Sequence, residues 1–208
     1  MRVIAECGVN WRSFDEARLM IQKAKDAGCW AAKFQLFTKK EAPNLPEHLY
    51  LSHGQAEMLF DTGKHEVGIE VFFTPMFLEA VDWCEQIGVN YYKIRYTDRH
   101  NKKLLKKIRK TKKFTMISMN LEEIKKKYKN FLWYLPLFCV PKYPADLYDY
   151  YYGWLFDGYS DHTPDLTLLK DMFSMPWIKV FEKHVKLDEN CIESAWSVTF
   201  EQLKEVLK

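Results

Sequence analysis

Two histidines stand at matching places in two short motifs, and together they could hold a metal ion. His162 lies in Gly-Tyr-Ser-Asp-His-Thr at 158–163, and His184 lies in Val-Phe-Glu-Lys-His-Val at 180–185. Each follows a short apolar run, and if these runs are neighbouring parallel strands, about 4.8 Å apart, the two imidazoles lie side by side. Neutral imidazole suits a divalent cation when oxygen ligands complete the shell. The pattern therefore predicts a metal site, although a histidine in an apolar context can also be an ordinary core residue.

The two-residue period of a strand sorts the neighbours of these histidines. Glu182 shares a face with His184, and Lys183 points to the opposite side. Ser160 shares a face with His162 in the same way. Glu182 and Ser160 are therefore expected to face the same site as the two imidazoles.

Polar residues recur at or just beyond the carboxyl ends of the apolar runs. Lys33 and Lys93 could hold an anionic substrate, because ammonium groups pair with carboxylate and phosphate oxygens. Thr74, Ser118 and Ser160 could add hydroxyl donors. The same residues could instead be no more than the polar strand ends of a short barrel. The full set is Glu6, Asn10, Lys33, Gln35, Thr74, Lys93, Ser118, Tyr143, Ser160, Asp161, His162, Glu182 and His184.

Strand and helix patterns alternate along the whole chain and would position these residues. Eight such alternations follow one another at a spacing of about 25 residues, which is short for a (β/α)8 TIM barrel of about 250 residues. We predict strands at 3–7, 30–35, 69–73, 91–94, 114–118, 131–139, 154–158 and 177–182. We predict helices at 14–27, 55–65, 77–87, 102–109, 121–128, 164–173 and 199–207, with an irregular tyrosine-rich stretch after the sixth strand.

The prediction is therefore an α/β fold, a TIM barrel of minimal length that forms a single domain over 1–208. Its active face would be the carboxyl ends of the strands. The alternative is an open, doubly wound sheet. That fold usually carries Gly-x-Gly-x-x-Gly after its first strand, and Gly8-Val-Asn10 does not supply this motif.

Lysine and arginine are concentrated at 102–113 and 125–129, although the net charge of the 208 residues is only +3. Leu104, Leu105 and Ile108 form an apolar stripe at helical spacing in the first run, so its lysines are best explained as the solvated face of an amphipathic helix. Nucleic-acid binding would require base-reading or stacking groups on the same surface. We predict no nucleic-acid partner.

The five cysteines are Cys7, Cys29, Cys84, Cys139 and Cys191. They are odd in number, show no Cys-x-x-Cys spacing and lie in apolar runs, so we expect buried, reduced thiols without disulfides. The chain shows no signal-peptide pattern and no apolar stretch long enough to span a membrane. We predict a soluble cytoplasmic protein without a membrane partner.

The motifs taken together resemble the sialic acid (N-acetylneuraminate) synthase family. They occur in family order along almost the whole chain, and the Ser-Asp-His-Thr and Glu-Lys-His blocks are the most specific. The matching segments are Ile-Ala-Glu-Cys-Gly-Val-Asn at 4–10, Ala-Lys-Phe-Gln at 32–35, Phe-Thr-Pro at 73–75, Tyr-Lys-Ile at 92–94, Ile-Ser at 117–118, Tyr-Pro at 143–144, 158–163 and 182–184.

The resemblance implies a transferase that condenses phosphoenolpyruvate with the aldehyde of an N-acylated amino sugar, giving a sialic acid or a related nonulosonic acid. It implies a divalent cation, Mn or Mg, at His162 and His184, and Glu6 or Glu182 as the carboxylate that handles the proton. The residues implied for phosphoenolpyruvate are Lys33, Lys93, Thr74, Ser118 and Ser160, and those implied for the sugar are Glu6, Gln35, Tyr143 and Glu182.

The sequence also departs from the family pattern. Trp11 replaces a histidine, Arg95-Tyr-Thr-Asp98 replaces Gly-Ser-Gly-Glu, and Pro141 replaces an asparagine. Glu193 stands in for the aspartate of a Pro-Gly-Pro-Asp block, and the resemblance makes it a candidate substrate-binding residue. The family continues into an antifreeze-like domain that covers a partner's site, and these residues contain no match to it. We therefore expect a homodimer or a separate capping domain. Two alternatives remain open, namely a binding or assembly protein that has lost the reaction, and an aldolase that uses Lys93 or Lys33 as a Schiff-base nucleophile.

Overall fold

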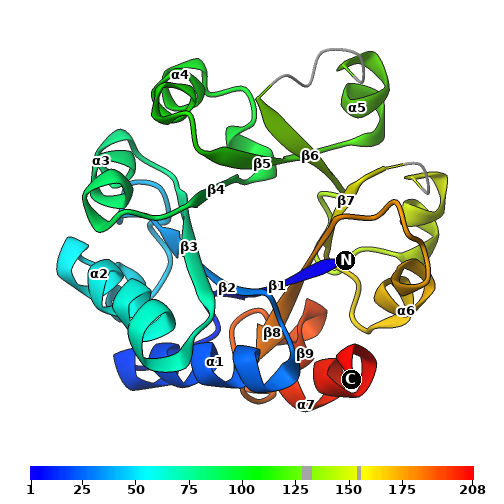
Figure 1. Ribbon diagram of the computed structural model, residues 1–208, viewed down its shortest axis with the longest axis horizontal. Helices are drawn as coiled ribbons and strands as arrows, with labels where there is room; N and C mark the ends of the chain where they lie inside the picture. Colours follow the sequence, from blue (N-terminus) through cyan, green and yellow to red (C-terminus); the bar gives the residue numbers. More distant parts are fainter. Residues whose placement is uncertain (128–132, 154–155) are drawn as a thin grey trace.

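The computed structural model describes residues 1–127, 133–153 and 156–208. Its parallel strands form a closed ring in which each strand pairs with the next along the chain, and β1 pairs with β8 to close it (Figure 1). The strands of the ring are β1 (Arg2–Gly8), β2 (Ala31–Leu36), β3 (Glu70–Pro75), β4 (Tyr91–Ile94), β5 (Phe114–Met119), β6 (Tyr134–Cys139), β7 (Gly158–Asp161) and β8 (Val180–Lys186). A two-residue strand, β9 (Val198–Thr199), pairs with the end of β8. The TIM-barrel prediction is confirmed.

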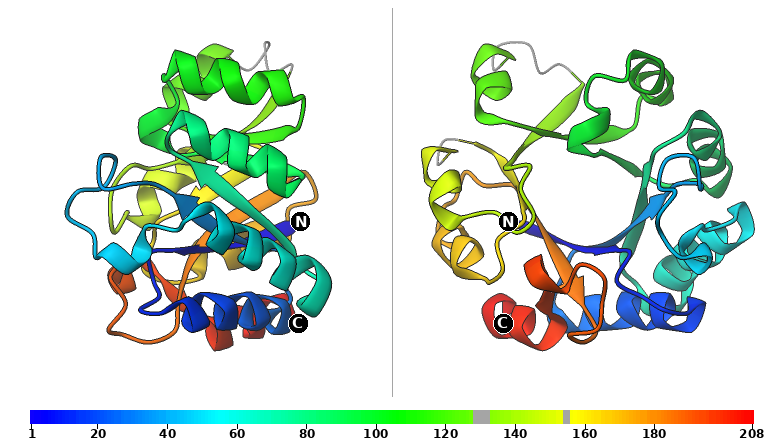
Figure 2. Two further views of the ribbon diagram at one scale, coloured as in Figure 1. Left: turned by 90° about the vertical axis from the view of Figure 1, so that its left-hand side faces the viewer. Right: turned by 180° about the vertical axis from the view of Figure 1, so that it is seen from behind.

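Helices cover the outside of the ring (Figures 1 and 2). They are α1 (Phe14–Ala27), α2 (His53–Asp61), α3 (Leu78–Ile87), α4 (Lys102–Thr111), α5 (Leu121–Lys127), α6 (Thr167–Phe173) and α7 (Phe200–Leu207). A π-helical turn, Thr62–Val67, extends α2. A 3-10 segment, Leu147–Gly153, takes the place of a helix between β6 and β7, where the sequence predicted an irregular stretch.

Local signals set the ends of the first helix. The Ser13 side chain accepts a hydrogen bond from the backbone N–H of Glu16, and Gly28 ends the helix at φ 92°, a left-handed conformation that suits glycine. A full capping box would also need a hydrogen bond from the backbone N–H of Ser13 to the Glu16 side chain. The Glu16 carboxylate instead accepts a hydrogen bond of 2.7 Å from the backbone N–H of Arg12.

Two strands were predicted a few residues too early in the sequence. The seventh was predicted at 154–158 and lies at Gly158–Asp161, whereas positions 154 and 155 are outside the described residues. The eighth was predicted at 177–182 and runs from Val180 to Lys186. Both errors share a cause, because inward-facing polar residues continue these strands where an apolar pattern ends. His184, which the prediction placed beyond the eighth strand, is thus inside β8.

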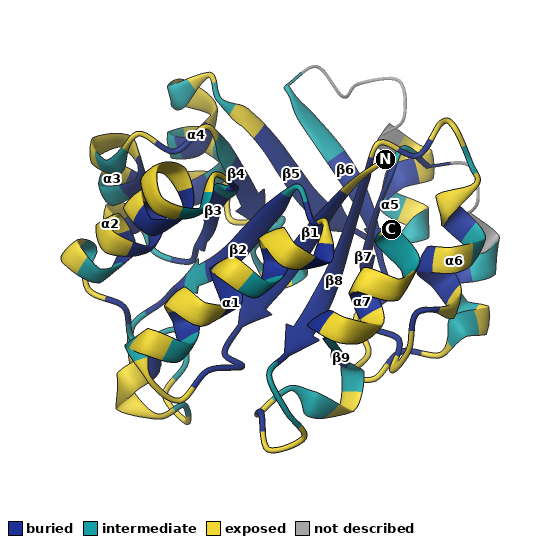
Figure 3. Ribbon diagram, turned by 60° about the horizontal axis from the view of Figure 1, so that its bottom comes forward, coloured by how far each residue is buried: buried dark blue, intermediate teal, exposed yellow. Residues whose placement is uncertain are grey.

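The core lies between the ring and the helices, and the strands are almost wholly buried (Figure 3). In α4, Leu104 and Ile108 are fully buried whereas most of its lysines are exposed, which confirms the solvated-face interpretation of the lysine run. All five cysteines are buried and free. Among the residues described, no helix combines the length and apolar character that a membrane crossing requires.

Candidate active site

The carboxyl ends of the strands surround a cavity of about 530 Å³. Every strand from β1 to β8 contributes at least one side chain to its wall. All the residues that the sequence assigned to catalysis, substrate or metal line it, namely Glu6, Lys33, Gln35, Thr74, Lys93, Ser118, Tyr143, Ser160, His162, Glu182, His184 and Glu193. The structure thus brings these side chains together, and their chemical roles stay predictions.

Glu182 joins the two cavity lysines. The Lys93 Nζ lies 3.0 Å from Glu182 Oε1, and Ser160 Oγ donates a hydrogen bond of 2.8 Å to the same oxygen. The Lys33 Nζ lies 3.7 Å from Glu182 Oε2. The side chain of each of these charged residues is 3% exposed. A carboxylate therefore balances two ammonium groups that water hardly reaches.

Hydroxyl groups and a second carboxylate complete this charged cluster. Lys33 forms an ion pair with Glu6 and donates a hydrogen bond of 2.9 Å to Thr74 Oγ1. Lys93 donates one of 2.8 Å to Ser118 Oγ. Each lysine therefore donates to hydroxyl and carboxylate oxygens in the cavity. The oxygens of an anionic substrate could take the place of these acceptors.

Burial and charge act in opposite directions on the ionisation of this cluster. Burial alone would raise the pKa of Glu182, but the charges of Lys33 and Lys93, with the hydrogen bond from Ser160, lower it to about 2. Burial lowers the pKa of Lys33 to about 8 despite the opposing charge of Glu182. Glu182 is therefore a permanent anion at neutral pH, whereas Lys33 can lose its proton near that range.

Strand register separates the two carboxylates by depth. Glu6 is paired with His184 across β1 and β8, whereas Glu182 is paired with Ile4 and, on its other side, with Ser160. Since inward-facing residues alternate along a strand, Glu182 lies one layer below His184. Glu6 therefore lies in the layer of the imidazoles, and Gln35 Nε2 donates a hydrogen bond of 3.0 Å to its Oε1.

The two imidazoles lie together as predicted, with ring centroids 5.2 Å apart. The Nδ1 of His162 lies 2.8 Å from the carbonyl oxygen of Val140. The Nδ1 of His184 lies 2.9 Å from Glu193 Oε2. Because both partners are acceptors, each Nδ1 carries a proton, and Nε2 is the nitrogen left to bind a ligand.

The two imidazoles could supply part of the ligand shell of a divalent cation. Within the described ranges, no group of three or more His, Cys, Asp or Glu side chains is placed to hold a metal ion, so water or substrate oxygens would have to complete the shell. Burial and the neighbouring His184 lower the pKa of His162 to about 3, which keeps the ring in the neutral form that binds metal. Two imidazoles do not by themselves select one divalent cation, so the assignment to Mn or Mg stays a prediction.

Two residues that the sequence placed on the active face point elsewhere. The Asp161 carboxylate turns away from the cavity and pairs with Lys183 at 3.0 Å, and both side chains are fully buried. Thr163 also contacts this pair, since its backbone N–H donates a hydrogen bond of 2.7 Å to Asp161 Oδ1. Asn10 binds backbone and side-chain groups beside β8 and does not line the cavity. Strand alternation required this for Asp161, because it lies between Ser160 and His162.

Comparison with known proteins agrees with this geometry. The NeuB family model matches residues 39–208. The chain is a member of the NeuB family. It is 28% identical to the N,N'-diacetyllegionaminic acid synthase of Campylobacter jejuni, over 90% of this chain and 68% of that protein. It is 27% identical to the human N-acetylneuraminate-9-phosphate synthase, over 99% of this chain and 68% of that protein.

A solved structure gives the same result for the barrel. The N-acetylneuraminic acid (sialic acid) synthetase from Leptospira borgpetersenii, crystallised with citrate, superposes with a TM-score of 0.85 at 25% identity. The match covers 99% of this chain and 80% of that one. The NeuB barrel is therefore present almost throughout the described chain.

Positions where this NeuB member departs from the family pattern surround the same cavity. Arg95, Tyr96 and Pro141 line the wall, and the Arg95 Nε is bound by Asp98 at 2.5 Å. Arg95 therefore reaches the cavity without filling it. Trp11 instead packs outside the cavity, 3% exposed, where its Nε1 donates a hydrogen bond of 3.2 Å to the carbonyl oxygen of Gly8.

Sequence reasoning missed two lining residues of the NeuB barrel. Cys139 was assigned to the core, and it ends β6 on the cavity wall, where its register partner is Ser160. Burial raises the pKa of its thiol to about 12, so it is inert. Thr97 lies in the short turn after β4. The position of Cys139 at the end of a predicted strand could have identified it as a lining residue.

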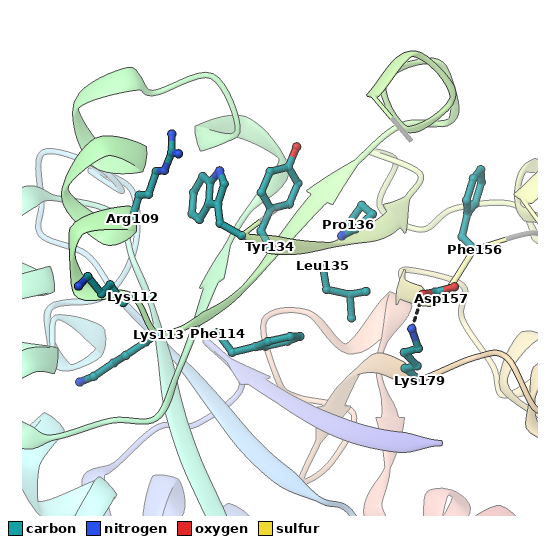
Figure 4. A pocket seen from close by; sticks show the side chains of 11 residues that line it. Arg109, Lys112, Lys113, Phe114, Tyr134, Leu135, Pro136, Phe156, Asp157 and Lys179 are labelled. Atoms are coloured by element: carbon teal, nitrogen blue, oxygen red, sulfur yellow. Dashed lines mark hydrogen bonds and ion pairs between the residues drawn. The ribbon is translucent and has the colours of Figure 1, made fainter. Parts of the chain in front are cut away.

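A larger cavity, of about 940 Å³, opens at the opposite end of the barrel (Figure 4). It is lined by Phe114 at the start of β5 and by Lys179 just before β8, which pairs with Asp157 at 2.7 Å. Among the described residues on its wall, Asp157 is the one carboxylate, and none is a histidine. Asp157 is already paired with Lys179, and the described wall offers no second carboxylate and no imidazole, so the smaller cavity is the candidate active site of this NeuB barrel.

Proposed function

We propose that this NeuB member condenses phosphoenolpyruvate with an N-acylated amino sugar aldehyde. The observation that carries the proposal is the convergence, in one cavity, of two lysines, two imidazoles and three carboxylates, with the hydroxyl groups of Thr74, Ser118 and Ser160 beside them. Its relatives are named as synthases of N,N'-diacetyllegionaminic acid and N-acetylneuraminate 9-phosphate, which supports a product of the sialic acid class.

The enolpyruvate would be held at the base of the cavity. Lys33 and Lys93 supply ammonium groups for its carboxylate and phosphate, and Thr74, Ser118 and Ser160 supply hydroxyls within the same hydrogen-bond network. Bringing two substrates into attack geometry in a cavity of this kind can remove about 7–11 kcal/mol from the barrier.

In the reaction, carbon 3 of phosphoenolpyruvate forms a bond to the aldehyde carbon, and water adds at carbon 2. Phosphate then leaves with cleavage of its C–O bond, so one water is consumed and one phosphate is released. A divalent cation held by His162 and His184 would supply Lewis-acid polarisation of the aldehyde oxygen.

Glu6 and Glu182 divide the remaining work by depth and ionisation. Glu182 lies in the deeper layer and is a permanent anion, so its part is to fix the charges of Lys33 and Lys93. Glu6 lies beside His184, in the layer of the imidazoles. We therefore assign the proton transfer that accompanies water attack or aldehyde addition to Glu6.

Phosphate release tests the proposed reaction directly. With phosphoenolpyruvate, Mn and a panel of N-acylated hexosamines, free and phosphorylated, we expect sugar-dependent release of inorganic phosphate. Lys93→Met should lose it by at least about 100-fold, because charged donors at a developing oxyanion contribute roughly that much each.

Lys103→Met, on the exposed face of α4, is the matched control and should keep full activity. Absence of turnover with every sugar, while calorimetry still detects phosphoenolpyruvate or Mn, would instead support the binding or assembly alternative.

A Schiff-base aldolase is the second candidate, because burial lowers the pKa of Lys33 to about 8. The ion pair with Glu6 opposes this role, since it engages the amine that would have to attack the carbonyl. We expect borohydride with pyruvate to leave the protein mass unchanged. A covalent adduct on Lys33 or Lys93, located by peptide mass spectrometry, would favour the aldolase.

A further inference from the structure

The loop that joins β8 to β9 places a carboxylate on one of the two imidazoles. Glu193 Oε2 lies 2.9 Å from His184 Nδ1, and the two side chains are 14% and 7% exposed. A carboxylate can only accept at this contact, so a hydrogen is fixed on Nδ1, and Nε2 is the nitrogen that can offer a lone pair to a ligand. Glu193 thereby determines which nitrogen of His184 is available to a ligand.

Asn10 fixes this loop to the strand that carries the histidine. Its side chain is fully buried, and its Oδ1 accepts a hydrogen bond of 2.8 Å from the backbone N–H of Glu193. Its Nδ2 donates a hydrogen bond of 2.8 Å to the carbonyl oxygen of Val185, the residue after His184. A single amide therefore holds Glu193 and the His184 backbone at a set separation.

Ser197 adds a second restraint on the same loop. The Asn10 Nδ2 also donates a hydrogen bond of 2.9 Å to Ser197 Oγ. That hydroxyl in turn donates a hydrogen bond of 2.7 Å to the carbonyl oxygen of Glu193. Both backbone groups of Glu193 are thus engaged by buried side chains. The position of its carboxylate is consequently set by the fold and not by solvent.

Gly8 leaves the space that this carboxylate occupies. A Cβ at position 8 would lie 2.6 Å from Glu193 Oε2 and 3.2 Å from Glu6 Oε1. Its φ of +46° also lies in the left-handed region that favours glycine. Any side chain here would push Glu193 away from His184.

The geometry points to Glu193 as the positioning residue of His184, held by Asn10 and accommodated by Gly8. This differs from the substrate-binding role that the sequence suggested for Glu193. The tautomer of His184 follows from the contacts alone, whereas its consequence for metal binding rests on the proposed function.

Nitrogen-15 NMR of the histidine rings measures the first consequence without substrate or metal. When the spectra are compared for the neutral ring, the proton of His184 should lie on Nδ1 in the wild type. Glu193→Ala and Gly8→Ala should each move the ring toward the form with the proton on Nε2, whereas Glu193→Gln should give an intermediate result because its amide oxygen is a weaker acceptor. Glu189→Ala, in the same loop but paired with Lys186, should leave His184 unchanged.

Calorimetry with Mn measures the second consequence. Loss of a carboxylate that orients a histidine ligand typically weakens metal binding by about 10–100-fold, and we expect this for Glu193→Ala but not for Glu189→Ala. An unaltered His184 signal in the folded Glu193→Ala, Glu193→Gln and Gly8→Ala variants would overturn the inference. Absence of Mn binding by the wild type would count against the metal part of the proposed function, and the NMR result would still decide the positioning role.

Discussion

Replacing Glu182 with glutamine should lower the free energy of unfolding by about 3–5 kcal/mol and abolish phosphate release. Removal of one partner from a buried ion pair leaves the other charge unbalanced, and this costs far more than loss of a surface pair. In this barrel the variant would remove a carboxylate that lies 3.0 Å from the Lys93 Nζ and 3.7 Å from the Lys33 Nζ, and the ion pair of Glu6 with Lys33 would not replace it at Lys93. Chemical denaturation followed by circular dichroism measures the loss.

The Lys23–Glu201 pair provides a matched control on the surface. Glu201 is 69% exposed, so Glu201→Gln should change stability by about 1 kcal/mol or less. Combining Glu182→Gln with Lys93→Met should restore part of the lost stability, because the double variant buries one charge fewer. Equal unfolding midpoints for Glu182→Gln and Glu201→Gln would contradict the account of the charged cluster.

The pH dependence of this difference has a definite sign. The pKa of Glu182 is lowered from 4.5 to about 2 by Lys33 and Lys93, against the effect of burial. A carboxyl with a lowered pKa stabilises the folded state fully above its unfolded value, and this stabilisation is lost as the pH falls through the folded value. The stability gap between wild type and Glu182→Gln should therefore be constant above pH 4.5 and shrink toward pH 2.

The helices of the barrel were predictable because their signals are local. The helix at 14–27 was predicted with the bounds that α1 has, since a side-chain cap at Ser13 and a left-handed Gly28 mark its ends. The strand at 91–94 was also correct, because apolar residues and flanking turns delimit it. Such features depend on a few neighbouring residues, and the sequence displays them directly.

The ends of the later strands were not predictable in the same way. β8 continues through Glu182, His184 and Lys186, although hydropathy marks these positions as the end of a strand. In a closed barrel an inward-facing polar residue can remain in a strand when partners from other strands satisfy it. Those partners, such as Ser160 and Lys93, are distant in sequence, so only the closed ring reveals them.

The membership of the site could be predicted better than its internal contacts. The carboxyl ends of parallel strands meet at one face, so the twelve candidate residues converge without any knowledge of side-chain geometry. The role of Glu193 was out of reach, because its contact with His184 depends on how the residues between β8 and β9 fold over Asn10. Asp161 was assigned wrongly, although strand alternation applied to Ser160 and His162 was sufficient to exclude it.

Adding Mn should raise the thermal stability of the folded protein. A ligand that binds only the native state stabilises it by about 2.7 kcal/mol at a hundred-fold excess over its dissociation constant. Thermal unfolding should therefore shift upward with Mn, and His162→Ala or His184→Ala should each abolish the shift, since the described residues supply these two imidazoles and no larger donor group.

His65→Ala is the matched control for this experiment, because His65 is 63% exposed and lies outside the cavity. Wild type and His65→Ala should respond to Mn alike. Equal shifts in all four proteins would mean that the metal binds elsewhere on the surface. A shift that survives in His184→Ala but not in His162→Ala would mean that one imidazole suffices, and the paired geometry of β7 and β8 would then have another purpose.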